Sequence, residues 1–393
     1  MTLRTLDDIG EVDGTRVFVR VDLNVPQHDG AVSDDSRISA VVPTLRELLS
    51  RGASLVCASH LGRPGGRAVP GLTMAPVGER MAQLLDLGVV TMDTPAPALE
   101  DLPDAPVVLL ENLRFDPGEE ADDPAFAGRL AELADAYVDD AFGAAHRRHA
   151  SVSALPDLML ASGRPAVAGR LLEREVRVLG ELLADPAHPY VAILGGAKIS
   201  DKLRVIDALL ERVDVLLIGG AMAFTLIAAR GGDIGRSLVE PDRFTDVLAS
   251  LEKAERLGVP ITLPADFVAA ASMDRPEPNR IVPADAIPDD LMGLDIGPET
   301  VEAFSEVIAG AKTVLWNGPM GVFEIAPFAA GTNGVAAAVA DATAFTVVGG
   351  GDSLSAVKGA GLADRFDHLS TGGGASLEFL EGHPLPGIAI LED

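Results

Sequence analysis

Charged and amide side chains follow the predicted strands in the first half of the chain, where open α/β sheets bind ligands. They are Asp22, Asn24, His60, Arg63, Arg114, His146 and Arg147, and Arg37 stands at the start of the helix beyond the first loop. Arginine binds carboxylate and phosphate oxygens in a bidentate manner. This part of the chain is therefore predicted to bind a small polyanion.

Glycines take the same positions in the second half of the chain. They occur in Gly195-Gly196-Ala197-Lys198, Gly219-Gly220, Asn317-Gly318-Pro319, Gly349-Gly350-Gly351-Asp352 and Thr371-Gly372-Gly373-Gly374. Glycine lets the backbone approach a base or a phosphate, and helix N-termini attract anions. Neither GxxxxGK[ST] nor GxGxxG occurs, so the pattern predicts a nucleotide site without a P-loop or a dinucleotide fingerprint. An anion half and a nucleotide half together indicate phosphoryl transfer between two substrates.

Short β-branched runs alternate with helix-period stretches, which predicts βαβ units and parallel sheets. The expected strands are residues 16–21, 53–59, 107–110 and 136–138, then 190–194, 213–218, 260–263, 313–316 and 344–348. The expected helices include residues 36–51, 201–211 and 241–257. A strongly periodic helix over residues 171–183 separates the two series, and we interpret it as a stiff hinge.

Composition narrows the possible partners. The 393 residues carry a formal charge of −28, which repels nucleic acid and anionic membranes. The single cysteine, Cys57, excludes an intrachain disulfide, and its apolar surroundings predict an inert buried thiol. The first residues lack the apolar core of a signal peptide, and the longest apolar run is too short to span a bilayer. We expect a soluble, cytoplasmic protein.

Nine segments, in order, resemble the motifs of the phosphoglycerate kinase family. They are RVDLNVP, SHLGRP, LLENLRF, DDAFGAAHR, LGGAKISDK, IGGAMAFT, VLWNGPMGVFE, GGGDS and STGGGASLEFLEG, and they run from Arg20 to Gly382. The resemblance implies two Rossmann-like domains with parallel sheets flanked by helices. Residues 1–168 would bind the triose, 169–185 would form the interdomain helix, and 186–376 would bind the nucleotide. Residues 377–393 would return to the first domain.

The resemblance also implies roles for single residues. The 3-phosphoglycerate moiety would be held by Asp22, Asn24, Arg37, His60, Arg63, Arg114 and Arg147. Among these, Asp22 and Asn24 would take the hydroxyl and carboxyl end, Arg37 would face the transferred phosphoryl group, and the others would bind the 3-phosphate. Arg148 stands beside Arg147, and whether it reaches the ligand stays open.

On the nucleotide side, the resemblance implies that Lys198 and Lys202 lie near the phosphates. Asp352 would hold Mg²⁺ together with the phosphates of ADP or ATP, beside Gly351 and Ser353, and Glu324 would accept hydrogen bonds from the ribose. The adenosine slot would be lined by Gly196, Ala197, Gly220, Gly293, Asn317, Pro319 and Val322. Gly372 and Gly373 would offer N–H groups to the moving phosphoryl group.

The implied reaction moves the acyl phosphate of 1,3-bisphosphoglycerate to ADP, reversibly and in line, after domain closure. Arg37, Lys198, Gly372 and Gly373 would act on the phosphoryl group, and no general base is needed because the acceptor is already ionised. We expect a monomer. Two alternatives stay open: another acyl-phosphate kinase, which would need a different anion pocket, and a non-catalytic binding module, which would be expected to lose Arg37, Lys198 or Asp352.

Overall fold

The computed structural model describes residues 2–393, which divide into two compact units. Unit 1 runs from the start of the chain to Arg177 and includes Pro384–Asp393, and unit 2 is Val178–His383. Helix α6 (Arg170–Ala184) contains the point of division. We had expected residues 377–383 with the first domain, but the structure places them in unit 2, where α13 (Gly374–Leu380) contacts α7 (Leu203–Leu209).

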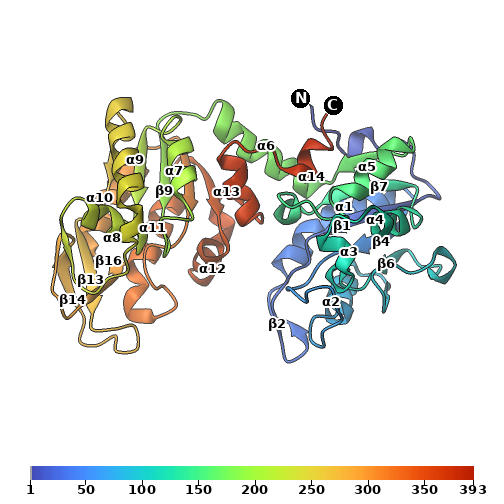
Figure 1. The fold of residues 1–393 in the computed structure, drawn as a ribbon, viewed down its shortest axis with the longest axis horizontal. Helices are drawn as coiled ribbons and strands as arrows, with labels where there is room; N and C mark the ends of the chain where they lie inside the picture. Colours follow the sequence, from blue (N-terminus) through green and yellow to red (C-terminus); the bar gives the residue numbers. More distant parts are fainter. Residues whose placement is uncertain (1) are drawn as a thin grey trace. The chain divides into compact units, whose positions relative to one another are not determined.

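Unit 1 is built on a six-stranded parallel sheet with the order β5-β6-β4-β1-β7-β8 (Figure 1). The strands are β1 (Arg16–Val21), β4 (Ser54–Ala58), β5 (Val89–Thr91), β6 (Val107–Leu109), β7 (Ala136–Asp140) and β8 (Ala166–Ala168). The helices are α1 (Ser36–Ser50), α2 (Ala75–Leu85), α3 (Pro117–Glu120), α4 (Pro124–Ala131), α5 (Ala154–Ala161) and α14 (Pro386–Ala389). A hairpin, β2 (Gln27–His28) with β3 (Ala31–Val32), follows the first strand.

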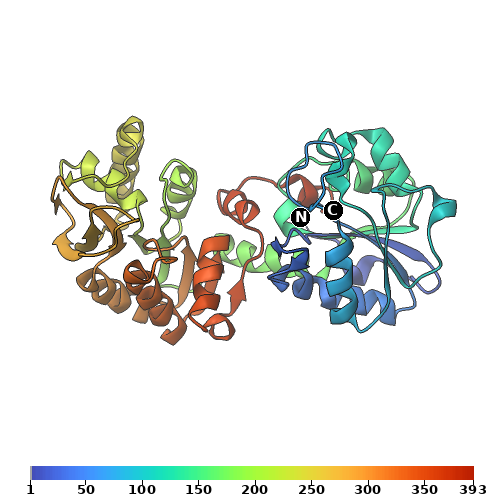
Figure 2. The same ribbon diagram turned by 90° about the horizontal axis from the view of Figure 1, so that it is seen from below.

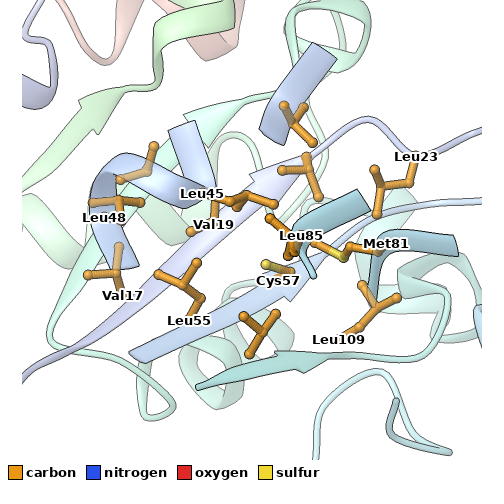
Figure 3. Packing of buried hydrophobic residues seen from close by; sticks show 14 of the residues in the cluster. Val17, Val19, Leu23, Leu45, Leu48, Leu55, Cys57, Met81, Leu85 and Leu109 are labelled. Atoms are coloured by element: carbon orange, nitrogen blue, oxygen red, sulfur yellow. The ribbon is translucent and has the colours of Figure 1, made fainter. Parts of the chain in front are cut away.

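The core of unit 1 forms where alternate apolar residues of the strands meet the apolar face of a helix. Every second residue of β1, such as Val17 and Val19, packs against the buried face of α1, which carries Leu45 and Leu48 (Figure 3). Period-two strands and period-3.6 helices place their apolar residues on one face, as this contact requires. Cys57 lies in this core, and burial raises the pKa of its thiol to about 12, so the predicted buried thiol is confirmed.

Unit 2 has a second parallel sheet, ordered β12-β10-β9-β17-β18-β19. Its strands are β9 (Tyr190–Leu194), β10 (Val215–Ile218), β12 (Ile261–Thr262), β17 (Thr313–Asn317), β18 (Phe345–Gly349) and β19 (His368–Leu369). The remaining helices are α8 (Met222–Ala229), α9 (Phe244–Leu257), α10 (Pro298–Ala309), α11 (Ala330–Asp341) and α12 (Gly351–Gly359). The expected fold class, two α/β units with parallel sheets, is confirmed.

An antiparallel sheet in unit 2 was not predicted from the sequence. It has the order β14-β13-β16 and consists of β13 (Asp266–Ala270), β14 (Arg280–Pro283) and β16 (Met292–Ile296). A two-stranded parallel pair, β11 (Asp233–Ile234) with β15 (Ala286–Ile287), also belongs to this unit. None of the helices in residues 2–393 is long and apolar enough to cross a membrane.

The two ends of the described chain meet in unit 1. Leu3 forms an antiparallel bridge with Glu392, and the Arg4 guanidinium donates to the carbonyl oxygen of Ile390 at 2.6 Å. The N and C marks stand side by side in both views (Figures 1 and 2). Leu385, Ile388 and Leu391 are buried, so this returning segment completes the unit's packing.

Candidate active site

Asp22 and Arg37 form an ion pair directly after β1. Arg37 lies in the first turn of α1, and its Nη1 is 2.5 Å from Oδ2 of Asp22. Burial raises the pKa of the Asp22 carboxyl, but the charges of Arg37 and Arg20 and the hydrogen bond from the Asn24 N–H lower it, and the pKa lies below its ordinary value. The carboxylate is therefore ionised at neutral pH and holds Arg37 at the end of the strand.

Asn24 links this loop to the loop that follows β4. Its Oδ1 accepts a hydrogen bond from the backbone N–H of Gly62 at 2.9 Å. Arg114, on the loop after β6, donates from Nη1 to the carbonyl oxygen of the same Gly62 at 2.7 Å. Three strand ends are thus joined through one glycine. This arrangement follows from the parallel sheet, whose strand ends meet at one edge.

His60 is nearly buried beside these residues. Burial, with the nearby charges of Arg20, Arg114 and Arg37, lowers its pKa well below the ordinary value, although Asp22 acts in the opposite sense. Burial also lowers the pKa of Arg114, and the charges of Arg20 and Arg147 add to this effect, although Glu120 opposes it. The contacts of Asp22 with Arg37, of Asn24 and Arg114 with Gly62, and of His60 with Arg20 hold these expected triose residues at the ends of neighbouring strands.

Two expected residues are more peripheral. Arg63 is exposed, and Arg147 is exposed with its Nε 3.3 Å from Nε2 of His146. Arg148, which the sequence left open, forms an ion pair with Asp122 at 3.5 Å. The exposed guanidinium groups of Arg63 and Arg147 are free to meet a ligand from solution.

Sequence reasoning missed four buried polar residues near His60 and Arg114. They are Arg20, Glu119, His149 and Ser151. Burial lowers the pKa of His149 to about 4, helped by the charges of Arg114, Arg20 and Arg147. An available signal was Arg20 itself, because a charged residue in an otherwise apolar strand, RVFVRV, requires a buried partner.

Unit 2 contains a cavity of about 310 Å³ at the ends of its strands. Its lining includes the expected nucleotide residues Gly196, Ala197, Gly220, Gly293, Pro319, Val322, Glu324 and Asp352. Side chains that sequence reasoning missed supply the apolar walls, namely Phe224, Leu238, Phe267, Met273 and Met292. A mostly apolar slot with a few carboxylates at its edge fits a flat base and a ribose.

Close backbone approach explains the glycines at two positions of this cavity. Gly220 has φ +65°, and a Cβ there would stand 2.5 Å from the backbone nitrogen of Gly196. A Cβ at Gly293 would stand 2.4 Å from Cζ of Phe224. Any larger residue would move the walls of the slot.

Lys202, Asn317 and Ser353 are not among the lining residues of the cavity and contact protein groups instead. The Lys202 amine donates to the main-chain and side-chain oxygens of Asn317, and the Ser353 hydroxyl accepts from the N–H of Gly318 at 2.6 Å. Ser353 is fully buried. These residues therefore support the loop of residues 317–319, with the Lys202 amine held by Asn317.

Lys198 and the glycines of residues 372–373 lie outside the lining of the cavity. Lys198 is exposed on a loop held by Glu240, whose Oε2 accepts from the N–H groups of Ile199 and Ser200 at 2.7 and 3.1 Å. Gly372 and Gly373 directly precede α13, and Gly373 has φ +54°. Glu240 was also missed, because a lone glutamate in a loop gives no sequence signal.

The described residues offer few ligands for a magnesium ion. Within residues 2–393, no group of three or more His, Cys, Asp or Glu side chains is arranged to hold a metal. Asp352 presents one exposed carboxylate at the second residue of α12. One carboxylate fits an ion that brings its other ligands as phosphate oxygens and waters, as Mg²⁺ does with nucleotides.

Comparison with known proteins decides the family. The family model described as phosphoglycerate kinase matches residues 6–383. The chain belongs to the phosphoglycerate kinase family. The chain is 53% identical to the phosphoglycerate kinase of Salinispora tropica over 406 aligned residues, covering all of both proteins. It is 54% identical to that of one strain of Thermus thermophilus, covering 99% of this chain and all of the relative.

Solved structures agree with the family assignment. The phosphoglycerate kinase of Coxiella burnetii superposes with a TM-score of 0.87 at 36% identity, covering 99% of each chain. That of Pyrococcus horikoshii gives 0.86 at 31% identity, covering 99% of this chain and 98% of the other. The chain is therefore a kinase, and the resemblance read from its nine motifs is confirmed.

Proposed function

We propose that this kinase reversibly transfers the acyl phosphate of 1,3-bisphosphoglycerate to ADP, with the triose bound by unit 1 and Mg·nucleotide bound by unit 2. The observation that carries this proposal is the pairing of two unlike sites in one chain. Unit 1 gathers cationic side chains around Asp22, and unit 2 holds a glycine-walled apolar slot edged by Glu324 and Asp352.

In unit 1 we assign the 3-phosphate to His60, Arg63, Arg114 and Arg147, and the hydroxyl and carboxyl end to Asp22 and Asn24. We assign Arg37 to the transferred phosphoryl group, because its ion pair with Asp22 keeps the guanidinium at the strand end. Bidentate guanidinium contacts suit the three equatorial oxygens of that group.

In unit 2 we assign the base to the apolar walls of the slot, the ribose hydroxyls to Glu324, and Mg²⁺ on the phosphates to Asp352. Lys198, Lys202 and the N–H groups at Gly372 and Gly373 would balance the phosphate charge. When bound, the ion neutralises charge on the nucleotide phosphates. The supporting residues Asn317, Ser353 and Gly351 would keep these groups in place.

The acceptor in either direction is already an anion, so direct displacement needs no general base. It does need the attacking oxygen to lie about 3–3.5 Å from the phosphorus atom. Water must also be excluded from the reacting groups. Because the assigned sites belong to different units, the proposal requires that the units close on the bound substrates. We place the flexing points at the ends of the α6 helix and near residues 370–374.

A coupled assay that follows ATP formation from 1,3-bisphosphoglycerate and ADP tests this proposal. We expect Mg²⁺-dependent ATP formation and no phosphorylated enzyme after mixing with either donor alone. Phosphohistidine on the isolated protein would replace direct transfer with a two-step reaction. Absence of ATP formation, with a folded protein, would reject the assigned reaction.

A further inference from the structure

Arg20 is a fully buried arginine in β1, beneath the cationic cluster of unit 1. Its guanidinium has three separate partners. Nε donates to the Ser151 hydroxyl at 2.8 Å, Nη1 donates to the carbonyl oxygen of Val21, and Nη2 lies 3.2 Å from Nδ1 of His60. A planar group with three fixed contacts has little freedom to rotate, so its position relative to the His60 ring is defined.

A buried glutamate, which shares the contact with Ser151, balances the charge of Arg20. Glu119 is fully buried, and its carboxylate accepts from the Ser151 hydroxyl at 2.7 Å and from the Ser151 N–H at 3.0 Å. The Tyr137 hydroxyl donates to the carbonyl oxygen of Ser151 at 2.8 Å. An unpaired buried charge would be strongly destabilising, so this chain of contacts accounts for an arginine in an apolar strand.

The contact between Arg20 and His60 determines where the ring carries its proton. Guanidinium nitrogens only donate hydrogen bonds, so Nδ1 must accept with its lone pair. An imidazole that accepts at Nδ1 is neutral and carries its hydrogen on Nε2. Among residues 2–393, no group forms a hydrogen bond to His60 Nε2, so this N–H remains for a ligand.

We infer that Arg20 is a positioning residue that fixes His60 as the neutral Nε2–H tautomer, which then donates to an oxyanion of the triose substrate. The inference rests on the proposed function for the identity of that oxyanion. In this arrangement the surrounding guanidinium groups balance the ligand's charge, and the hydrogen bond from His60 fixes the orientation of the ligand. A neutral donor also keeps its role unchanged across the neutral pH range.

The charged groups that face His60 agree with this assignment. Arg20, Arg114 and Arg37 oppose a charge on the ring, whereas Asp22 favours one. Asp22 is also paired with Arg37 at 2.5 Å. Burial then leaves the neutral form favoured.

Nitrogen-15 NMR of the ligand-free protein tests the assignment without any substitution. We expect His60 to show a protonated Nε2 and an unprotonated Nδ1 at every pH from about 6 to 8. A protonated Nδ1, or an imidazolium form in this range, would overturn the inference even if kinase activity is normal. Absence of kinase activity with the expected NMR pattern would reject the proposed function and leave the tautomer assignment intact.

Two substitutions at His60 separate the tautomers by kinetics. The amide of glutamine in His60→Gln can place a donor near the position of Nε2, whereas that of His60→Asn can place one only near Nδ1. We expect His60→Gln to keep a KM for 3-phosphoglycerate at least about tenfold lower than His60→Asn, the loss expected for a hydrogen bond to a charged group. Equal KM values, or the reverse order, would contradict the inference.

Substitutions beneath the ring test the role of Arg20. Arg20→Met should allow the other tautomer to appear and should raise the KM for 3-phosphoglycerate about tenfold, with the KM for Mg·ATP unchanged. Arg16→Met, at the half-buried start of the same strand, is the matched control. If Arg20→Met does not fold, Ser151→Ala removes one anchor of Arg20 and should change the tautomer ratio in the same direction. An unchanged ratio in a folded Arg20 or Ser151 variant would overturn the positioning role.

Discussion

The side-chain amine of Lys202 lies 2.8 Å from the main-chain carbonyl oxygen of Asn317 and donates a second hydrogen bond to that residue's amide oxygen. The amine is nearly buried, and burial lowers its pKa to about 8, although Asp201 and Asp352 oppose the shift. The charge that Lys202 offers to a nucleotide therefore depends on pH within the working range.

We predict that nucleotide affinity falls as pH rises through about 8. The lysine carries its charge below this pKa and loses it above, so the KM for Mg·ATP should rise by up to about tenfold per pH unit. Lys202→Met should have a higher KM that no longer changes in this range. Lys253→Met, at an exposed ion pair with Glu211, is the control. A flat wild-type profile from pH 7 to 9.5 would contradict the prediction.

Arg37→Ala should lower kcat by about 10³, the lower range for an arginine that contacts a transferring phosphoryl group. The ion pair with Asp22 positions this guanidinium. Removing the guanidinium leaves the charge that develops on the phosphoryl group without a partner. Steady-state kinetics would show the loss. Arg46→Ala, on the same helix and hydrogen-bonded to the carbonyl of Leu84, should have nearly no effect. A change in KM alone would show that Arg37 has another role.

Arg114→Ala should act on KM instead. We assign Arg114 to the remote 3-phosphate, which is bound equally before and during transfer, so uniform binding is lost and kcat is retained. We expect the KM for 3-phosphoglycerate to rise and the KM for Mg·ATP to stay constant. Arg129→Ala, at an exposed ion pair with Asp116, is the control. A fall in kcat as large as that of Arg37→Ala would refute the division of roles.

Gly220→Ala should close the nucleotide slot. The new Cβ would lie 2.5 Å from the Gly196 nitrogen, on a backbone with φ +65°. Gly231→Ala controls for backbone strain, because Gly231 has φ +89° and nothing lies within 4 Å of its Cβ position. Calorimetry should show weaker ADP binding for Gly220→Ala alone, with 3-phosphoglycerate binding kept by both. Equal losses in the two variants would indicate strain and not a clash.

Asp352→Asn should weaken the binding of Mg·ADP and lower kcat, since a neutral amide replaces the one carboxylate in the first turn of α12. Binding of 3-phosphoglycerate alone should be nearly unchanged, as unit 1 is not altered. Titration calorimetry with each ligand, with and without Mg²⁺, would measure both effects. Asp364→Asn, also exposed in unit 2, serves as the control. A large loss of triose affinity would reject the assignment.

The sequence predicted the parallel sheets because buried strands have a strong local signal. Residues 190–194 were expected as a strand and form β9 at those bounds. The antiparallel sheet was missed, because β13 (DFVAA) and β14 (RIVP) are short and their pairing is decided by contacts far along the chain. Propensity within a window of residues carries no information about such partners.

The site shows the same division. Motif residues such as Asp22 and Gly220 could be found because they follow predicted strands, where parallel sheets bind ligands, and because their segments resemble family motifs. Phe224 and Met292 could not, because aromatic and methionine side chains in helices and strands are usually core residues. Only the folded structure shows that they face the cavity. Arg20 was visible as a charge in an apolar strand, but its partners Ser151 and Glu119 lie more than 95 residues away.

The return of Pro384–Asp393 to unit 1 affects the order in which the protein can fold during synthesis. A ribosome releases Val178–His383 as a continuous stretch, so unit 2 can fold as soon as that stretch has emerged. Unit 1 begins earlier, but its packing is complete only when the buried side chains of Leu385, Ile388 and Leu391 have been added. The first residues translated thus belong to the unit that is completed second. During this interval its unfinished surface is open to chaperones and proteases.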